Sequence, residues 1–141
     1  VGIHTSEGIP AVRELANFHR RAPADAPWSP SPGLTKAARD HVRDQGPQGT
    51  TGHSGSDGSD MAKRISRYGR WGKSAGENID YGNDRARLIV LSLLVDDGVA
   101  SRGHRDNIMS AGYRFIGVAT GAHQVYGQMC VMDFAGNYKD N

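Results

Sequence analysis

The side chains best suited to chemistry are two histidines and a few carboxylates, each in a polar segment that contains glycine. They are His53 in residues 52–58, Glu77 in residues 76–79, Asp96 and Asp97 in residues 95–98, and His104 in residues 102–108. Two neutral imidazoles and two carboxylates in one cleft suit a divalent metal such as zinc, with one position left for water. Without a metal, the same groups could support acid–base chemistry, because neighbouring histidines and carboxylates shift each other's pKa. Either site requires a fold that brings the four segments together.

Each segment also has a structural explanation when taken alone. A histidine in a loop is usually solvated, and Glu77 could simply pair with a nearby arginine. Asp96 and Asp97 follow an apolar helical pattern, where the negative end of the helix dipole disfavours acids by a few tenths of a kcal/mol. We therefore expect a partner to hold them, such as Arg102, a histidine or a cation.

Neither of two familiar catalytic or phosphate-binding patterns occurs in the chain. The sequence contains no Gly-x-x-x-x-Gly-Lys and no His-Glu-x-x-His. Arg64, Arg67 and Arg70 could form a basic helical face with Tyr68 and Trp71 interleaved, but a solvated charged face is the simpler interpretation.

Composition predicts a single soluble domain over residues 1–141. The chain is 37% apolar and 23% charged, and its net charge of +2 is too small to indicate a nucleic-acid partner. Mean hydropathy of −0.57 argues against an integral membrane segment. The single cysteine, Cys130, excludes a disulfide within the chain and a cysteine-based zinc cluster, and it lies in a run that predicts a buried strand. We expect a monomer.

Apolar periodicity and turn residues predict helices followed by an antiparallel hairpin, which is an α+β order. The predicted elements are helices over 7–21, 34–45, 59–68 and 85–96, a strand over 76–81, a helical turn near 105–109, and hairpin strands over 114–120 and 124–134 joined at 121–123. Gly46-Pro47 is expected to stop the second helix, Ser59 or Asp60 to cap the third, and Asp84 to cap the fourth, which should be the most buried helix. Trp28 should hold the proline-rich loop 22–33 against the core. The 19 glycines predict a chain rich in loops.

Six short motifs follow one another along the chain: Asn17-Phe18-His19-Arg20, Leu34 with Ala37-Ala38, His53 in Gly-His-Ser, Glu77 in Gly-Glu-Asn-Ile, His104 in Gly-His-Arg-x-Asn-Ile, and Ile116-Gly117-Val118. Their order resembles the CAP superfamily, which groups cysteine-rich secretory proteins, antigen 5 and pathogenesis-related proteins. The resemblance covers nearly the whole chain and is typical of a bacterial member, without the disulfides of eukaryotic relatives.

The resemblance implies a three-layer α-β-α sandwich with a central antiparallel sheet and a cleft lined by two histidines and two acids. Carried over residue by residue, these are His53, His104, Glu77 and a second acid, for which we favour Asp97 over Asp96, with Asp57 as an extra acid that could compensate. His53 and His104 would be the ligands of zinc or another divalent cation. Family members are mostly secreted, so the resemblance also implies an extracellular or cell-envelope location, with Val1 near a mature start.

The sequence is compatible with three functions, because fold membership does not fix activity. The first is a secreted binding module whose cleft takes a divalent cation and a small ligand, such as a lipid, peptide or glycan, or an extracellular partner. The second is a hydrolase in which His53 or His104 activates water and Glu77 orients it or acts as a base. The third is a structural polar network that holds the loops together.

Overall fold

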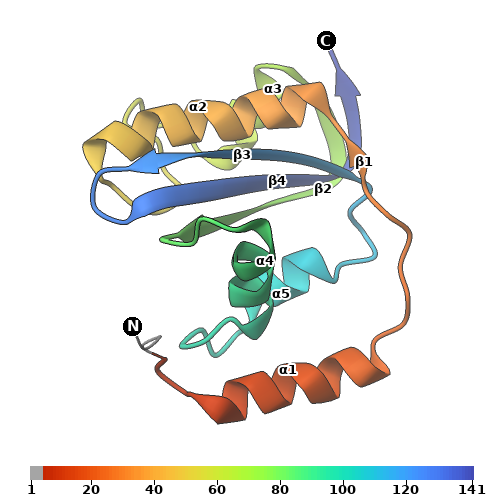
Figure 1. Ribbon diagram of the computed structural model, residues 1–141. Helices are drawn as coiled ribbons and strands as arrows, with labels where there is room; N and C mark the ends of the chain where they lie inside the picture. The colour runs from red at the N-terminus through yellow and green to blue at the C-terminus, as the bar shows by residue number, and fades with distance from the viewer. Residues whose placement is uncertain (1–4) are drawn as a thin grey trace.

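The computed structural model describes residues 5–141, in which a four-stranded sheet lies between two layers of helices (Figure 1). The elements in chain order are α1 (Ile9–Arg21), β1 (Ser29–Pro30), α2 (Pro32–Gln48), α3 (Met61–Ser66), β2 (Gly69–Tyr81), α4 (Ala86–Val95), α5 (Gly103–Ile108), β3 (Phe115–His123) and β4 (Gly127–Asp140). Helices α2 and α3 cover one face of the sheet, and α4, α5 and α1 lie on the other side. The predicted α+β class and three-layer sandwich are confirmed. Residues 1–4 lie outside the described residues.

The sheet has the strand order β1-β3-β4-β2, so β2 is an edge strand and β4 lies beside it in the interior of the sheet. Strands β2, β4 and β3 are antiparallel, as predicted for the hairpin. The two-residue β1 adds a parallel pairing with β3, which makes the sheet mixed. The position of β2 matters for function, because loops from both helical layers can reach an edge strand.

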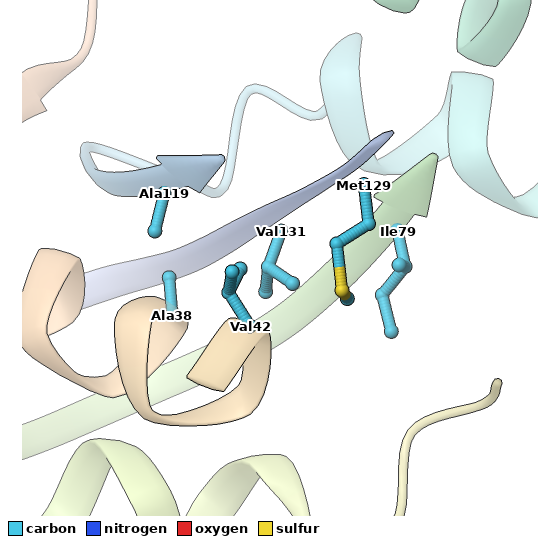
Figure 2. Close-up of a cluster of buried hydrophobic side chains, with 6 residues drawn as sticks. All are labelled: Ala38, Val42, Ile79, Ala119, Met129 and Val131. Atoms are coloured by element: carbon cyan, nitrogen blue, oxygen red, sulfur yellow. The ribbon is translucent and has the colours of Figure 1, made fainter. Parts of the chain in front are cut away.

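The core between α2 and the sheet is built from small, β-branched and flexible side chains. Figure 2 shows one cluster in which residues from α2 meet residues from β2, β3 and β4. Its members are Ala38, Val42, Ile79, Ala119, Met129 and Val131. The alanines of α2 let this helix approach the sheet closely, and this contact fixes the helix that precedes the His53 loop.

Helix α2 is longer than the sequence predicted. It begins at Pro32 after the N-cap Ser31 and continues through Gly46-Pro47 to Gln48. The expected stop at Gly46-Pro47 is therefore wrong. Gly46 packs against the carbonyl of Ala122, where a side chain would not fit, and Pro47 lies in the last turn, where its missing N–H removes a single helical bond. Gly49, in the left-handed conformation, ends the helix instead.

The second core lies between the other face of the sheet and α4. It contains Ile89, Leu93, Cys130, Met132 and Phe134, with Trp28 packed against it. The Trp28 ring lies 5.3 Å from that of Phe134, which confirms that Trp28 holds its loop to the core. Cys130 is buried in β4, as predicted.

Helix α4 is not the most buried helix, contrary to the sequence-based expectation. Only Ile89 and Leu93 are buried, whereas Leu88 and Leu91 are each 41% exposed. Uniform apolar character predicted burial on all sides, but α4 packs against the sheet along one stripe only.

Several element boundaries also differ from the prediction. The third helix is confirmed with Asp60 as its N-cap, but the fourth begins after Arg85 without a side-chain cap from Asp84. The edge strand extends over 69–81 rather than 76–81, and the hairpin turns at 124–126 rather than 121–123. Across the described residues, no helix combines the length and apolar character needed to cross a membrane.

Candidate functional site

His53 and Glu77 form the first histidine–carboxylate pair of the site. His53 Nδ1 donates to Glu77 Oε1 at 2.8 Å. The Glu77 side chain is 2% exposed, whereas that of His53 is 57% exposed. The pair therefore joins a buried anion to an imidazole that faces solvent.

Arg64 holds the same carboxylate from the buried side. Its Nη2 donates to both Glu77 oxygens, at 3.0 and 2.7 Å, and its Nη1 donates to the carbonyls of His53 and Ser59. One guanidinium thus ties α3, the His53 loop and β2 together. Arg64 is 1% exposed, so the prediction that it belongs to a solvated charged face is wrong for this residue.

These contacts decide the ionisation of Glu77. Burial raises its pKa, but the hydrogen bond from His53 and the adjacent Arg64 charge lower it by more, so the pKa lies below its ordinary value. Glu77 is therefore a carboxylate with both oxygens already engaged.

Asp96 and His104 form the second pair. His104 Nδ1 donates to Asp96 Oδ1 at 2.7 Å, and the His104 backbone N–H donates to Asp96 Oδ2 at 2.9 Å. Asp96 ends α4 in the left-handed conformation, with φ of 53°, which aims its side chain back at the start of α5. The expectation that a partner holds the acids after this helix is confirmed for Asp96 by His104.

The placement of Asp97 and Asp57 corrects the sequence-based assignment. Asp97, the acid that the sequence analysis favours, turns away and accepts hydrogen bonds from the backbone N–H groups of Ser6 and Glu7. Asp57 pairs with Arg67 instead of reaching the histidines. The sequence alone cannot distinguish two adjacent aspartates that follow a helix. The left-handed backbone conformation at Asp96 is what directs the two side chains to different partners.

The two pairs meet at neighbouring residues of the edge strand β2. Glu77 belongs to the first pair, and the next residue, Asn78, donates to the carbonyl of His104 at 2.9 Å. Asn107 on α5 then bonds Asn78 Oδ1 and the Glu77 carbonyl. The structure thus brings His53 and His104 to the same stretch of β2 from opposite helical layers.

Arg64 and Asp133 were not predicted from the sequence as members of this network. Asp133 is 0% exposed and lies directly opposite Glu77 on β4. Its position within an otherwise apolar strand, between Met132 and Phe134, was a signal, because an acid in a buried strand needs a partner.

Residues 72–76, Gly-Lys-Ser-Ala-Gly, match the Gly-x-Ser-x-Gly pattern of a nucleophile elbow. An elbow requires a sharp turn between a strand and a helix. Here the segment lies inside β2, at a bulge where Lys73 has a φ of 68°. Ser74 is therefore part of a bulged strand and lacks the context of that motif.

The donor set leaves one nitrogen available on each imidazole. Both Nδ1 atoms are bonded to carboxylates, and neither Nε2 has a hydrogen-bond partner among residues 5–141. A carboxylate on the remote nitrogen is the usual support of a metal-binding histidine. No group of three or more His, Cys, Asp or Glu side chains in residues 5–141 is arranged to hold a metal ion. The protein would therefore supply two imidazole ligands, with the carboxylates supporting them.

A separate groove of about 1230 Å³ lies beside α1 and the proline-rich loop. Its apolar lining includes Phe18, Trp28, Ile108 and Met109, and its polar lining includes His19 and Arg21. Neither His53 nor His104 lines this groove. The molecule thus carries two distinct candidate sites.

Comparison with known proteins agrees with the fold and the motifs. The model of the cysteine-rich secretory protein family, CAP, matches residues 13–134. The chain therefore belongs to this family. The comparison with curated proteins found no match.

Two solved bacterial structures share the fold. An outer surface protein from Borrelia burgdorferi matches with a TM-score of 0.67 and 18% identity, over 99% of this chain and 97% of that one. An extracellular protein containing an SCP domain from Bacillus anthracis matches with a TM-score of 0.62 and 16% identity, over 96% of this chain. The match covers 45% of the Bacillus protein. At these identities, the likeness concerns the fold alone.

Proposed function

We propose that this CAP domain binds a divalent cation, zinc or a similar metal, through His53 Nε2 and His104 Nε2. The observation that carries the proposal is that a buried carboxylate holds Nδ1 of each imidazole, at 2.8 Å for His53 and 2.7 Å for His104, and that the two histidines bond the adjacent residues Glu77 and Asn78 of β2. This arrangement fixes the tautomer that presents a lone pair at Nε2. A bound cation would supply Lewis acidity and leave coordination positions open to water or a ligand.

The two acids act as supports in this proposal. Glu77 is engaged by His53 and Arg64, and Asp96 is engaged by the His104 side chain and backbone. With two ligands from the protein, the site should bind metal more weakly than a closed structural zinc site with four protein ligands. We therefore expect the bound cation to exchange readily with cations in solution.

Calorimetric titration of zinc into the metal-free protein tests the proposal. We expect one zinc per chain, with affinity reduced at least about tenfold in His53→Ala and in His104→Ala, and binding lost in the double variant. His19→Ala, on α1, is the matched control and should bind as the wild type does. Absence of zinc binding in the wild type, or unchanged binding in the double variant, would overturn the proposal.

The alternative hydrolase function with Glu77 as general base finds less support. A general base works best with a pKa near the operating pH and a free oxygen. The pKa of Glu77 is lowered and both of its oxygens are occupied, so proton abstraction by Glu77 would have to break its pairing with Arg64.

The structural role of the network is compatible with cation binding, because Arg64 and Asn78 bond the backbone of the two histidine segments.

We also propose that the groove beside α1 takes a small apolar or amphiphilic ligand. Its volume of about 1230 Å³ exceeds the usual range for small-molecule sites, about 300–1000 Å³, and suits an elongated molecule. Phe18, Trp28, Ile108 and Met109 would contact an apolar chain, while Arg21 could meet a polar or anionic end.

Tryptophan fluorescence can test this second site, because Trp28 lines the groove. In a Trp71→Phe background, Trp28 is the remaining tryptophan. Saturable addition of a long-chain fatty acid should shift its emission to shorter wavelength, and Met109→Phe should weaken binding by narrowing the groove. No saturable change, or an equal change in Met109→Phe, would contradict the proposal.

An extracellular or cell-envelope location is part of the same proposal. It is supported by the described locations of the two structural neighbours, an outer surface protein and an extracellular protein. Fractionation of the native host, with the protein found in the medium or envelope, is the expected result; recovery in the cytosol alone would contradict it.

A further inference from the structure

The buried carboxyl group of Asp133 is not among the groups that would hold a cation. Asp133 lies directly opposite Glu77 in the antiparallel pairing of β4 and β2. Side chains directly opposite in such a pair share a face, with Cβ atoms about 4.5–5.5 Å apart. Both side chains are buried, so two carboxyl groups face each other away from water.

The buried cluster contains one fixed positive charge for these two acids. Arg64 donates from Nη2 to Glu77 and from Nη1 to the carbonyls of His53 and Ser59. Neither Asp133 oxygen has a donor among the described residues. If both acids were ionised, two like charges would lie opposite each other with one carboxylate uncompensated, which is a costly arrangement in a buried site.

The other groups around Asp133 do not remove this conflict. Its neighbour on β3 is Gly117, which has no side chain. On α2, the buried His41 lies within range of the charges of Arg64 and Glu77, and burial lowers its pKa, which favours the neutral form. Tyr138, further along β4, has its pKa raised to about 12, first by burial and then by the charge of Asp140, so it is also neutral.

We propose that Asp133 is a protonated carboxylic acid in the folded protein at neutral pH, and that it donates its proton in a hydrogen bond to Glu77. A proton on Asp133 converts the repulsive pair into a donor and an acceptor and leaves Glu77 as the single anion between Arg64 and His53. Asp133 is then a positioning residue, which holds the Glu77 carboxylate against His53 Nδ1. The inference holds whether or not a cation binds at His53.

The direction of the Asp133 pKa agrees with this geometry. Burial, and then the negative charge of Glu77, raise the pKa well above its ordinary value. A raised pKa in the folded state contributes stability below the unfolded-state pKa, and this contribution is lost as the pH rises through the folded-state value. Asp133→Asn carries no titratable proton, so it should become more stable relative to wild type as the pH rises from about 4 to about 8.

Infrared difference spectroscopy of the metal-free protein at neutral pH provides the main test. We expect a carbonyl band of a protonated carboxylic acid, shifted by deuteration, in the wild type and its absence in Asp133→Asn. Loss of a similar band in Glu77→Gln with retention in Asp133→Asn would place the proton on Glu77 and overturn the proposal. A wild type without the band would also overturn it.

The positioning role is tested by a conservative and a disruptive variant. The amide of Asp133→Asn can still donate to Glu77, whereas the side chain of Asp133→Leu cannot. We expect the imidazole ¹⁵N chemical shifts of His53, which report the protonated ring nitrogen, to remain as in wild type for Asp133→Asn and to change for Asp133→Leu. If Asp133→Leu does not fold, Asp133→Asn alone decides: changed His53 shifts in the folded variant would contradict the role.

Discussion

The backbone of Gly117 on β3 touches the backbone of α2 at Leu34. A Cβ placed on Gly117 would lie 2.1 Å from the Leu34 carbonyl carbon and the Thr35 nitrogen. Because these neighbours are backbone atoms, they can move only if the helix moves. The absence of a side chain at Gly117 therefore sets the distance between α2 and the sheet, and through α2 the position of the His53 loop.

The first prediction concerns this contact. Gly117→Ala should destabilise the protein by about 1–3 kcal/mol or more, because it overpacks a rigid contact. Urea unfolding measures the loss. Gly72→Ala is the matched control, because a Cβ there meets only the Asn137 Cβ at 4.0 Å and the φ is not in the left-handed region. Equal stability of the two variants would contradict the close approach.

The second prediction separates Asp96 from Asp97. Asp96→Gly keeps the left-handed conformation available and removes the carboxylate that holds His104. Zinc affinity should fall about 10–100-fold, which is the typical effect of removing a group that hydrogen-bonds a metal-binding histidine. Asp97→Ala should leave the affinity unchanged, since Asp97 bonds the backbone of Ser6 and Glu7. The reverse pattern in calorimetry would restore Asp97 as the second acid.

The third prediction concerns the buried ion pair. Arg64→Met leaves the Glu77 carboxylate buried without its cation, which should cost about 3–5 kcal/mol of unfolding free energy. Arg67→Met is the control. Its pair with Asp57 is largely exposed, so the loss should stay below about 1 kcal/mol. If urea unfolding shows only a small loss of unfolding free energy in Arg64→Met, the prediction is contradicted, and water must already solvate the Glu77 carboxylate.

The fourth prediction concerns Cys130. Burial, and then the nearby Asp80 charge, raise its pKa to about 11, and the thiolate is the reactive form. A thiol reagent at neutral pH should label the native protein far more slowly than the protein unfolded in guanidinium chloride. Fast stoichiometric labelling of the native state, measured by mass spectrometry, would contradict the buried position of this residue.

The fifth prediction concerns the attachment of α1. Arg102 donates to the carboxylates of Glu7 and Glu14 and to the Asp96 carbonyl. Arg102→Gln should therefore increase tryptic cleavage within α1. Arg114→Gln is the control, since its contact with Asp25 is 3.4 Å long and exposed. Equal protection of α1 in both variants would rule out the Arg102 attachment.

The same attachment should depend on acid pH. The hydrogen bond from Arg102 is the main cause that lowers the pKa of Glu7 to about 2. A lowered folded-state pKa contributes stability above the unfolded value of 4.5, and that contribution is lost as the pH falls towards 2. Backbone chemical shifts of residues 9–21 should therefore move between these pH values in the wild type, and much less in Arg102→Gln.

The sequence predicted the order of elements well, because amphipathic periodicity and β-branched runs are local signals. Prediction from the sequence failed where packing between residues far apart in the chain determines the local structure. Gly46-Pro47 is a local stop signal, but the helix continues because Gly46 packs against Ala122. Similarly, Arg64 had the sequence spacing of a solvated face and became buried because Glu77 lies beneath it.

The candidate site shows the same division. The types and order of His53, Glu77 and His104 were visible in the sequence, whereas the choice between Asp96 and Asp97 required the backbone angle at one residue. Asp133 was missed because its role depends on a cross-strand neighbour, Glu77, that lies far away along the chain.

Asp96 connects the His104 pair with the attachment of α1. Its carboxylate holds His104, and its carbonyl accepts a hydrogen bond from Arg102, which also holds α1 beside the groove. A ligand that shifts α1 would therefore act on the residue that orients one of the two imidazoles. Thermodynamic linkage makes any such effect reciprocal: by whatever factor an occupied groove changes cation affinity, a bound cation changes ligand affinity by the same factor.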